Sequence, residues 1–430
     1  MTETNTQKPK NRAVLVGLWA YRLEREENAT EESMEELSDL LKTAGGECVG
    51  TVLQQKDAPD PRTFIGEGKV EEVGALVQAM GATMVVFDNA LSHSQQRALS
   101  DDLGVAVLDR SALILDIFAQ RARTKEGRLQ VELAQYKYLL PRLLGMWKHL
   151  ERQEGAIGTR GPGETQLESD RRHIRKKIDK LEADLEQVRR VRATQRTRRE
   201  KNEVSVVAIV GYTNAGKSTL LNALTGADIP ANNRLFDTLD TTTRTLEISD
   251  TCTVLISDTV GFISKLPHHL VEAFKATLEE LSYADLLLHV IDASNPLWRE
   301  QAEVVEKLIY ELGASHTPRI DVFNKSDKYT TDIIPHGEDI VSISARTGAG
   351  LDRLREMIGA RLDMGACRVV LEVPYQMGGV VDQLHRKAKV EQLEYGDTIR
   401  VTAVCNPREL GQLREYIVEG WTPPKEPWED

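Results

Sequence analysis

The stretch "VSVVAIVGYTNAGKSTLLNALTG", residues 204–226, joins an apolar strand to a helix through a glycine-rich turn. The turn matches G-x-x-x-x-G-K-[ST] from Gly211 to Ser218, the pattern of a phosphate-binding loop in an α/β fold. Its glycines let backbone N–H groups turn inward around phosphates. Lys217 is placed to reach the β and γ phosphates, and the Ser218 hydroxyl to complete the coordination of Mg²⁺. A chance meeting of a strand with a glycine-rich turn is the alternative, but strand, loop and helix follow in the correct order. The residues predicted to bind nucleotide here are Gly211, Tyr212, Thr213, Asn214, Ala215, Gly216, Lys217, Ser218 and Thr219.

A second motif, "DTVG", follows the apolar strand "TVLIS" and comprises Asp258, Thr259, Val260 and Gly261. Asp258 is expected to hold the magnesium ion through a water molecule, and the Gly261 N–H to meet the γ phosphate. This segment is therefore the predicted sensor of the γ phosphate.

Two further motifs select the base. "NKSD", after the strand "RIDVF", comprises Asn324, Lys325, Ser326 and Asp327, whose carboxylate can accept from both N1–H and the N2 amino group of guanine. Adenine offers neither donor, so a buried Asp327 would be left unpaired, and GTP is favoured over ATP as the substrate. "SISARTG" supplies Ser344 and Ala345, followed by Arg346, for the guanine O6 edge. Each motif alone is more often a surface turn, but their order after strands makes the combination specific.

The segment "LFDTLDTTTRTLEI", residues 235–248, should contain the threonine that senses the γ phosphate and binds Mg²⁺. Thr238, Thr241, Thr242 and Thr243 are the candidates, and the residues alone do not choose among them. A threonine-rich loop is also often only a solvated turn.

Phe262 follows "DTVG", where many small GTPases have a glutamine that orients the attacking water. A phenylalanine cannot hold a water molecule by hydrogen bonds. Intrinsic hydrolysis is therefore expected to be slow unless a partner completes the site. The alternative is that another residue of this chain positions the water.

Residues 12–125 alternate short apolar runs with helix-like stretches, which predicts a small α/β domain with a mostly parallel sheet. Strands are expected from "AVLVGLW", "CVGTVLQQ", "TMVVFD" and "VAVLD", with helices between them. Within this region "GEGK", Gly66–Lys69, opens a predicted helix, either as an anion site at the helix amino terminus or as a plain loop-to-helix junction.

Residues 126–202 carry apolar residues at steps of three and four, the spacing of a helical seam. The seam positions are Leu129, Leu133, Tyr136, Leu140, Leu143, Trp147 and Leu150 in the first arm, and Leu167, Arg171, Ile174, Ile178, Leu181, Leu185 and Val188 in the second. Pro141 removes one backbone donor within the first arm and is expected to kink it. The glycine-rich segment "GAIGTRGPGETQ", residues 155–166, joins the arms, which are therefore predicted to fold into an antiparallel hairpin.

Residues 203–363 alternate strand and helix again and form the predicted nucleotide-binding domain. Residues 366–418 predict a small α+β domain whose last element is a helix from "PRELGQLREYI", residues 407–417. Residues 419–430 are expected to be an unstructured tail.

The composition is that of a soluble globular protein, with 40% hydrophobic and 28% charged residues. The formal net charge of −12 argues against indiscriminate nucleic-acid binding, yet Arg171–Lys201 holds thirteen Lys or Arg against five Asp or Glu. This basic arm is expected to meet a polyanion. Nowhere do eighteen apolar residues follow one another, so no membrane span is indicated. The four cysteines form no CxxC pair, which suggests neither a zinc site nor a disulfide framework and fits a reducing cytoplasm.

Six segments together resemble the HflX family of translational GTPases: "FIGEGK", "GTRGPGETQLESDRR", "GYTNAGKSTL", "FDTLDTTTR", "DTVGFI" and "NKSD". The similarity runs from about residue 12 to the carboxyl-terminal piece, and the glycine loop with its flanks is the most family-specific part. The resemblance implies an amino-terminal domain with a helical hairpin that precedes a Ras-like G domain.

The resemblance also implies roles for single residues. The family's magnesium ligands correspond to Ser218 and Thr238 in this sequence. The expected catalytic residues are Lys217, Thr238 and Gly261. The nucleotide-contacting residues of this loop would be Phe236, Asp237, Thr238, Leu239 and Asp240. The sequence departs from the family at two places, because Asp237 stands where alanine is usual and Thr241 where proline is usual. Family members also have a hydrophobic residue at the position of Phe262.

The partners implied by the resemblance are the ribosome, chiefly its large subunit and rRNA, together with GTP and GDP. Family members bind the large subunit, the ribosome stimulates their hydrolysis, and some separate ribosomal subunits under stress; ATP binding has been attributed to the amino-terminal region. The chain is expected to be a cytoplasmic monomer. Two other functions fit the motifs, namely a GTPase acting in large-subunit assembly and a nucleotide-gated rRNA-binding module with incidental hydrolysis.

The hairpin tip would reach the RNA in this interpretation, because glycines allow close backbone approach and an arginine can stack on a base or pair with a phosphate. The expected RNA contacts are Gly155, Gly158, Arg160, Gly161, Gly163, Arg171 and Arg172. In the alternative interpretation, the arms pack only against the chain's own domains and the basic face is merely solvated.

Overall fold

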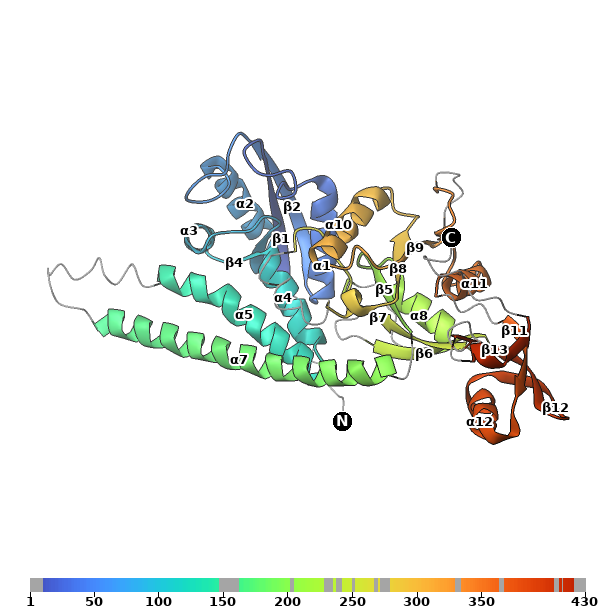
Figure 1. Ribbon diagram of the computed structural model, residues 1–430. Helices are drawn as coiled ribbons and strands as arrows, with labels where there is room; N and C mark the ends of the chain where they lie inside the picture. Colours follow the sequence, from blue (N-terminus) through green and yellow to red (C-terminus); the bar gives the residue numbers. More distant parts are fainter. Residues whose placement is uncertain are drawn as a thin grey trace, which may run out of the picture. The chain divides into compact units, whose positions relative to one another are not determined.

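The computed structural model describes residues 11–146, 162–201, 205–227, 235–236, 242–249, 252–266, 270, 279–328, 334–362, 367–405, 410–411 and 413–420 (Figure 1). The described residues of Met1–Thr197, Asn232–Asp240 and Val260–Leu278 form one compact unit, and those of Arg198–Ala231, Thr241–Thr259 and Glu279–Asp430 form a second. Two segments from the predicted nucleotide-binding domain thus pack with the amino-terminal unit. Each compact unit is made of several separate segments, so the units do not correspond one to one with the domains predicted from the sequence. The boundaries of those domains remain predictions.

The first unit is built on a parallel sheet with the strand order β2-β1-β3-β4. Its elements are β1 (Arg12–Ala20), α1 (Glu31–Thr43), β2 (Glu47–Lys56), α2 (Glu67–Met80), β3 (Met84–Phe87), α3 (His93–Leu103), β4 (Ala106–Asp109) and α4 (Arg110–Arg121). Successive residues of β1 from Ala13 to Val16 are fully buried, so this strand is covered on both faces, as expected of a parallel sheet. The alternation of strands and helices predicted from the sequence is confirmed.

Local chemistry sets the ends of these helices. Thr30 and Ser92 cap α1 and α3, each accepting from the backbone N–H three residues on. Gly104 ends α3 in the left-handed conformation with φ 68°. Gly66 caps α2 without a side-chain hydrogen bond, and its N–H donates to the Gln54 side chain at 3.0 Å. The "GEGK" segment lies at this loop-to-helix junction, and anion binding there stays a prediction.

Two long helices, α5 (Lys125–Met146) and α7 (Pro162–Lys201), run side by side in the first unit (Figure 1). The residues buried between them are Leu133, Ile178, Leu181 and Leu185, with Leu129, Tyr136, Leu140 and Ile174 packed against these four. Lys137 pairs with Glu182 at 3.0 Å, and Glu126 pairs with Arg192 at 2.7 Å. The earlier residue of α5 thus contacts the later residue of α7, as expected of antiparallel helices. The antiparallel hairpin is confirmed, and α5 continues through Pro141 as one helix.

Asp109, at the end of β4, fixes the first arm of the hairpin to the sheet. Its fully buried carboxylate accepts from the Ala112 N–H at 2.9 Å, the Tyr138 hydroxyl at 2.8 Å and Arg142 Nη2 at 2.8 Å. Burial, together with the Asp109 charge, raises the pKa of Tyr138, so the phenol keeps its proton and donates. The Arg142 guanidinium stacks 3.3 Å from the centre of the Tyr138 ring. One buried acid thereby orients two side chains of α5.

The second unit contains a six-stranded sheet in the order β10-β9-β8-β5-β7-β6, in which only β6 is antiparallel to its neighbour. Its elements are β5 (Val206–Gly211), α8 (Lys217–Thr225), β6 (Thr242–Ser249), β7 (Cys252–Asp258), a 3₁₀ turn (Glu279–Tyr283), β8 (Leu286–Asp292), α10 (Trp298–Glu311), β9 (Arg319–Asn324), β10 (Ile340–Ser342) and α11 (Leu351–Arg361). The predicted motifs all follow the carboxyl ends of parallel strands, the edge where α/β sheets bind ligands.

The second unit also contains a smaller antiparallel sheet in the order β12-β13-β11-β14. Its elements are β11 (Cys367–Val373), a 3₁₀ turn (Tyr375–Met377), α12 (Gly378–Lys387), β12 (Lys389–Tyr395), β13 (Ile399–Cys405), a 3₁₀ turn (Arg414–Tyr416) and β14 (Ile417–Glu419). The helix predicted over residues 407–417 is wrong at its carboxyl end. There the β-branched residues Ile417 and Val418 belong to a strand that pairs with the open edge of β11.

Candidate functional site

Two glycines make the turn after β5 possible. A Cβ atom at Gly211 would lie 2.3 Å from the Val290 carbonyl oxygen of β8. A Cβ atom at Gly216 would lie 2.3 Å from Nδ2 of Asn324, and Gly216 has φ 97° at the start of α8. Close packing against neighbouring strands and a left-handed backbone therefore explain the glycines at these two positions of the motif.

Lys217 is buried, with 6% of its surface exposed, and its Nζ donates to the carbonyl oxygens of Gly211 (3.2 Å) and Tyr212 (2.9 Å). Burial lowers the pKa of Lys217 to about 8, and the charge of Asp258 opposes this shift. A cation that is poorly solvated gains much from a neighbouring polyphosphate. In the same loop the Thr213 hydroxyl is buried and has no hydrogen-bond partner among the described residues. The loop therefore offers a cation and a hydroxyl donor suited to phosphate oxygens.

Ser218 and Asp258 bring two hard oxygen donors together beside the phosphate loop. The Ser218 hydroxyl donates to Oδ2 of Asp258 at 2.7 Å, and Asp258 is fully buried at the end of β7. This donor set fits Mg²⁺, which prefers carboxylate and hydroxyl oxygens. The next residue, Thr259, donates its hydroxyl to the Ile209 carbonyl oxygen at 2.7 Å, which fixes the start of the "DTVG" segment against β5.

Asn324 connects the phosphate loop to the two base-reading motifs. Its Nδ2 donates to the Ala215 carbonyl oxygen at 2.9 Å, and its Oδ1 accepts from the Ala345 N–H at 3.0 Å. Lys325 forms an ion pair with Asp292 at 2.6 Å. A single buried amide thus sets the spacing between the phosphate-binding and base-binding loops.

Asp327 and Ser344 lie together as the motifs predict. The Ser344 hydroxyl donates to Oδ1 of Asp327 at 2.7 Å, and this hydrogen bond lowers the pKa of Asp327. The Asp327 carboxylate is exposed at the surface of the loop, where a base could reach it, and is held from below by the fully buried Ser344; its reading of guanine stays a prediction. Arg346 is exposed, and the Ser326 N–H donates to the Ile343 carbonyl oxygen at 3.0 Å.

The threonine-rich segment is described only at its ends. Thr242 and Thr243 belong to β6, where they pair with Asp258 and Ser257 of β7. Phe236 is buried with φ 56° and packs edge-on against Phe118 of α4, their ring centres 4.7 Å apart. The other predicted residues of this segment, Asp237, Thr238, Leu239, Asp240 and Thr241, lie outside the described residues.

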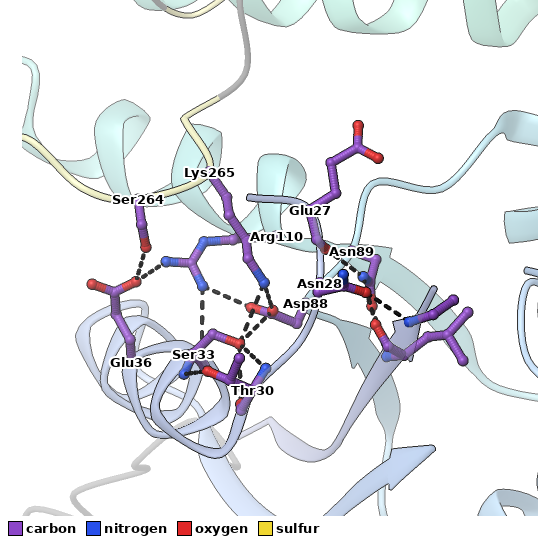
Figure 2. A network of polar contacts seen from close by, with 12 residues as sticks. Glu27, Asn28, Thr30, Ser33, Glu36, Asp88, Asn89, Arg110, Ser264 and Lys265 are labelled. Atoms are coloured by element: carbon purple, nitrogen blue, oxygen red, sulfur yellow. Dashed lines mark hydrogen bonds and ion pairs between the residues drawn. The ribbon is translucent and has the colours of Figure 1, made fainter. Parts of the chain in front are cut away.

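A buried polar network that the sequence motifs did not indicate holds the segment after Gly261 (Figure 2). Its centre is Asp88, which directly follows β3 and whose side chain is fully buried. Arg110 Nη1 lies 2.7 Å from Oδ1 of Asp88, Lys265 pairs with Oδ2, and the Ser33 hydroxyl donates to Oδ2 at 2.8 Å. Burial lowers the pKa of Lys265, and Asp88 opposes that shift. The carboxylate thus has three donors from three separate parts of the chain.

Glu36 of α1 completes the network as a second acid. It accepts from Arg110 and from the Ser264 hydroxyl, the latter at 2.8 Å. Two carboxylates therefore face two cations, which explains how these charges are tolerated in the interior. Phe262, in the same segment, is buried with 2% of its surface exposed. The available sequence signal was the position of Asp88 and Arg110 directly after buried strands, since polar groups at that edge of a parallel sheet often form sites.

The predicted RNA-contacting residues lie on α7 or before it. Arg172 is exposed, Gly163 belongs to the helix, and Arg171 is half-buried at its seam position with Nε lacking a hydrogen-bond partner among the described residues. Gly155, Gly158, Arg160 and Gly161 lie outside the described residues.

None of the described helices is both long enough and apolar enough to span a membrane.

Three family models match successive parts of the chain. They are the "GTP-binding GTPase N-terminal" model over residues 31–119, the "GTP-binding GTPase Middle Region" model over residues 121–199 and the "50S ribosome-binding GTPase" model over residues 206–325. The third match includes the phosphate loop, the "DTVG" segment and the start of "NKSD".

Relatives match at nearly full length. A GTPase HflX of Caldanaerobacter subterraneus is 48% identical over 95% of this chain and 94% of its own length. A GTPase HflX of Escherichia coli is 45% identical over 84% of this chain and 86% of its own. Among solved structures, a GTP-binding protein of Sulfolobus solfataricus in complex with GDP is 24% identical, with a TM-score of 0.44 over 82% of this chain and 98% of that one. The sequence relationships cover both the nucleotide site and the hairpin, and by them the chain is a GTPase that belongs to the HflX family.

Proposed function

We propose that this GTPase binds the large ribosomal subunit through its hairpin and, in its GTP form, separates 70S ribosomes into subunits, with hydrolysis stimulated by the ribosome. The observation that carries the proposal is the exposed basic face of α7. The family model that matches residues 206–325, described as a 50S ribosome-binding GTPase, supports the choice of partner.

Two groups of cations on the described part of α7 differ in their contacts. Lys177 and Arg192 face the first arm and pair with Glu132 (3.3 Å) and Glu126 (2.7 Å). The exposed cations between the tip and the middle of the helix are Arg172, Arg175, Lys176 and Lys180. Within the described part of the hairpin these four cations form no ion pair between the arms, so they are available to neutralise RNA phosphates. This division favours the RNA-binding interpretation over a merely solvated face.

The nucleotide chemistry follows from the site. Lys217 stabilises negative charge on the phosphoryl group as it is transferred, and Asp327 reads guanine. Ser218 and Thr238 would hold Mg²⁺, which supplies further charge neutralisation. Phe262 is buried and carries no hydrogen-bonding group, so the attacking water must be positioned by another group. We assign that role to the ribosome-bound state, which makes hydrolysis depend on the partner.

The polar network offers a route from the nucleotide to the hairpin. The Gly261 N–H is the expected contact of the γ phosphate, and Lys265, four residues later, pairs with Asp88 in the sheet that also carries Asp109. A change in the position of Gly261 on hydrolysis would act on this network. It would reach the base of α5 through Arg110, which pairs with Asp88 and directly follows Asp109, the acceptor of the Tyr138 hydroxyl.

The test measures GTP hydrolysis by the purified protein alone, with 70S ribosomes and with large subunits, while sedimentation follows subunit separation in the same samples. Strong stimulation together with separation supports the proposal. Stimulation without separation would point to a role in large-subunit assembly. Equal rates with and without ribosomes would refute the argument from Phe262.

Two variants locate the surface. Removal of Gly155–Gly163 is expected to abolish separation and to spare GTP binding, and survival of separation would remove the hairpin from the mechanism. Arg175→Ala is expected to weaken ribosome binding and to lower the slope of log K against log salt by about 1. Arg353→Ala is the matched control, because Arg353 is an exposed arginine on α11. An equal loss in both variants would show that the effect is not specific to α7.

A further inference from the structure

We propose that Cys367 and Cys405 are a redox modification site, which a peroxide converts into a reversible disulfide across two strands of the small antiparallel sheet.

The register of the sheet places these two residues directly opposite each other. Cys367 begins β11, Cys405 ends β13, and the two are Cα partners in the antiparallel ladder. Residues paired in this way have Cα atoms about 4.5–5.5 Å apart, within the range of about 4.4–6.8 Å that a disulfide spans. The spacing of the backbones therefore permits an S–S bond without a change of register.

Both side chains also point to the same face. The next pairs on that face are Val369 with Ala403 and Leu371 with Val401, and all four residues are buried in the core of the sheet. Because side chains alternate along a strand, Cys367 and Cys405 lie on the core face as well. Each is a reduced cysteine in the structure. Two thiols that share a face and a rung of the ladder can meet by rotation about their own side-chain bonds.

The two cysteines differ in access to solvent, and this sets the order of the reaction. Cys367 is half-buried, whereas Cys405 is fully buried. The Cys367 thiolate attacks hydrogen peroxide, the O–O bond breaks, and a sulfenic acid forms with release of one water molecule. The Cys405 thiol then attacks that sulfur, the S–S bond forms and a second water molecule leaves. The two thiols lose two electrons and two protons in total, and one peroxide is reduced to two waters.

The position of the pair makes the bond reversible in a cell. It is the last rung of the ladder between β11 and β13, and one of its two residues, Cys367, is only half-buried. Accessible disulfides are the ones that thiols such as glutathione reduce by exchange. The competing explanation is that the pair is only a small apolar contact at the edge of the core, as reduced cysteines often are. That explanation predicts no preference of these thiols for each other.

The experiment treats the full chain with hydrogen peroxide, blocks the remaining thiols with N-ethylmaleimide, and maps the peptides by mass spectrometry without reduction. The expected result is loss of two of the four thiols, with one peptide pair joined through residues 367 and 405 and separated again by dithiothreitol. Cys48 is the internal control, because it is also half-buried and its neighbours on the strand carry no thiol. It should remain alkylated at the peroxide dose that joins the pair.

Two variants test the order of events. In Cys405→Ser the sulfenic acid at Cys367 should persist and be captured by dimedone, whereas Cys367→Ser should leave Cys405 reduced. If either serine variant fails to fold, the alanine variant at the same position replaces it. Oxidation of Cys367 at the same rate as Cys48, or a bond formed only between two molecules on a non-reducing gel, would overturn the proposal.

Discussion

Burial lowers the pKa of Lys217 to about 8, so GTP binding, which brings negative charge beside this side chain, should change its ionisation. The pKa of about 8 means that roughly three quarters of these side chains are neutral at pH 8.5 before phosphate arrives. Phosphates favour the charged form, so GTP binding is expected to take up roughly 0.7 proton at pH 8.5 and about 0.1 at pH 7. It follows that affinity for GTP falls as the pH rises above 8.

Titration calorimetry at each pH, in two buffers of different ionisation enthalpy, measures this uptake directly. The same uptake at pH 7 and pH 8.5 would show that Lys217 does not control it.

Gly216 supports a second prediction at this scale. In Gly216→Ala the new Cβ would displace Asn324 from both the Ala215 carbonyl and the Ala345 N–H. Loss of buried hydrogen bonds costs about 1–3 kcal/mol, so GTP affinity is expected to fall by about tenfold or more. Gly226→Ala is the control, because Gly226 also has a left-handed φ of 67° but a Cβ there would meet nothing within 4 Å. Fluorescent-nucleotide titration compares the two, and equal losses would refute the steric argument.

The residues of the nucleotide site were predictable because the chemistry lies in short motifs after strands. Asn324, Asp327 and Ser344 come together as their spacing indicated. The pairing of Asp88 with Lys265 was not predictable, because 177 residues separate the two and the position of Asp88 after a strand does not indicate its partner.

The stability of the hairpin can be tested by single substitutions, because a small set of buried residues lies between its two helices. Leu181 is 3% exposed within the seam, so Leu181→Ala should cost about 2–5 kcal/mol in the free energy of opening the hairpin. Val191, on the same helix, is 59% exposed, and Val191→Ala should change that free energy by at most about 0.5 kcal/mol. Hydrogen exchange of the α5 and α7 amides measures both. Equal protection in the two variants would mean that the seam does not hold the arms together.

Elements were predicted well wherever the apolar period was regular. The apolar residues from Leu129 to Val188 predicted two helices, because a spacing of three and four residues places side chains on one face of a helix but not on one face of a strand. The end of the chain was harder, because "REYIVE" has no clear period and its fate depends on the free edge of β11. An element that is decided by pairing with a distant strand carries little local signal.

At the scale of the whole molecule, the network around Asp88 joins Ser264 and Lys265 to distant parts of the chain, the amino-terminal sheet and α1, within the first unit. Lys265→Met leaves Asp88 with one cation fewer, and breaking such a buried pair costs about 3–5 kcal/mol. Asp88→Asn should cost a similar amount. The double variant should lose less than the sum of the two, by at least about 1 kcal/mol, because the same interaction is removed only once.

Hydrogen exchange of the amides in residues 260–266 reports these free energies. The exposed pair Lys42–Asp39, whose side chains are 65% and 61% exposed, is the control, and its loss should change the free energy by at most about 0.5 kcal/mol. Additive effects of Asp88→Asn and Lys265→Met would show that the two side chains are not coupled.

The wide separation of Asp88 and Lys265 along the chain has a consequence for biosynthesis. A polypeptide emerges from its amino terminus at about 5–20 residues per second, so roughly 9–35 seconds pass between the appearance of Asp88 and that of Lys265. During that interval the newly made amino-terminal segment holds both acids of the network, Asp88 and Glu36 of α1, but only one of its two cations, Arg110. The network therefore gains its second cation only after β5, β6 and β7, three of the six strands of the nucleotide-binding sheet, have been translated, and its charges can balance only late in synthesis.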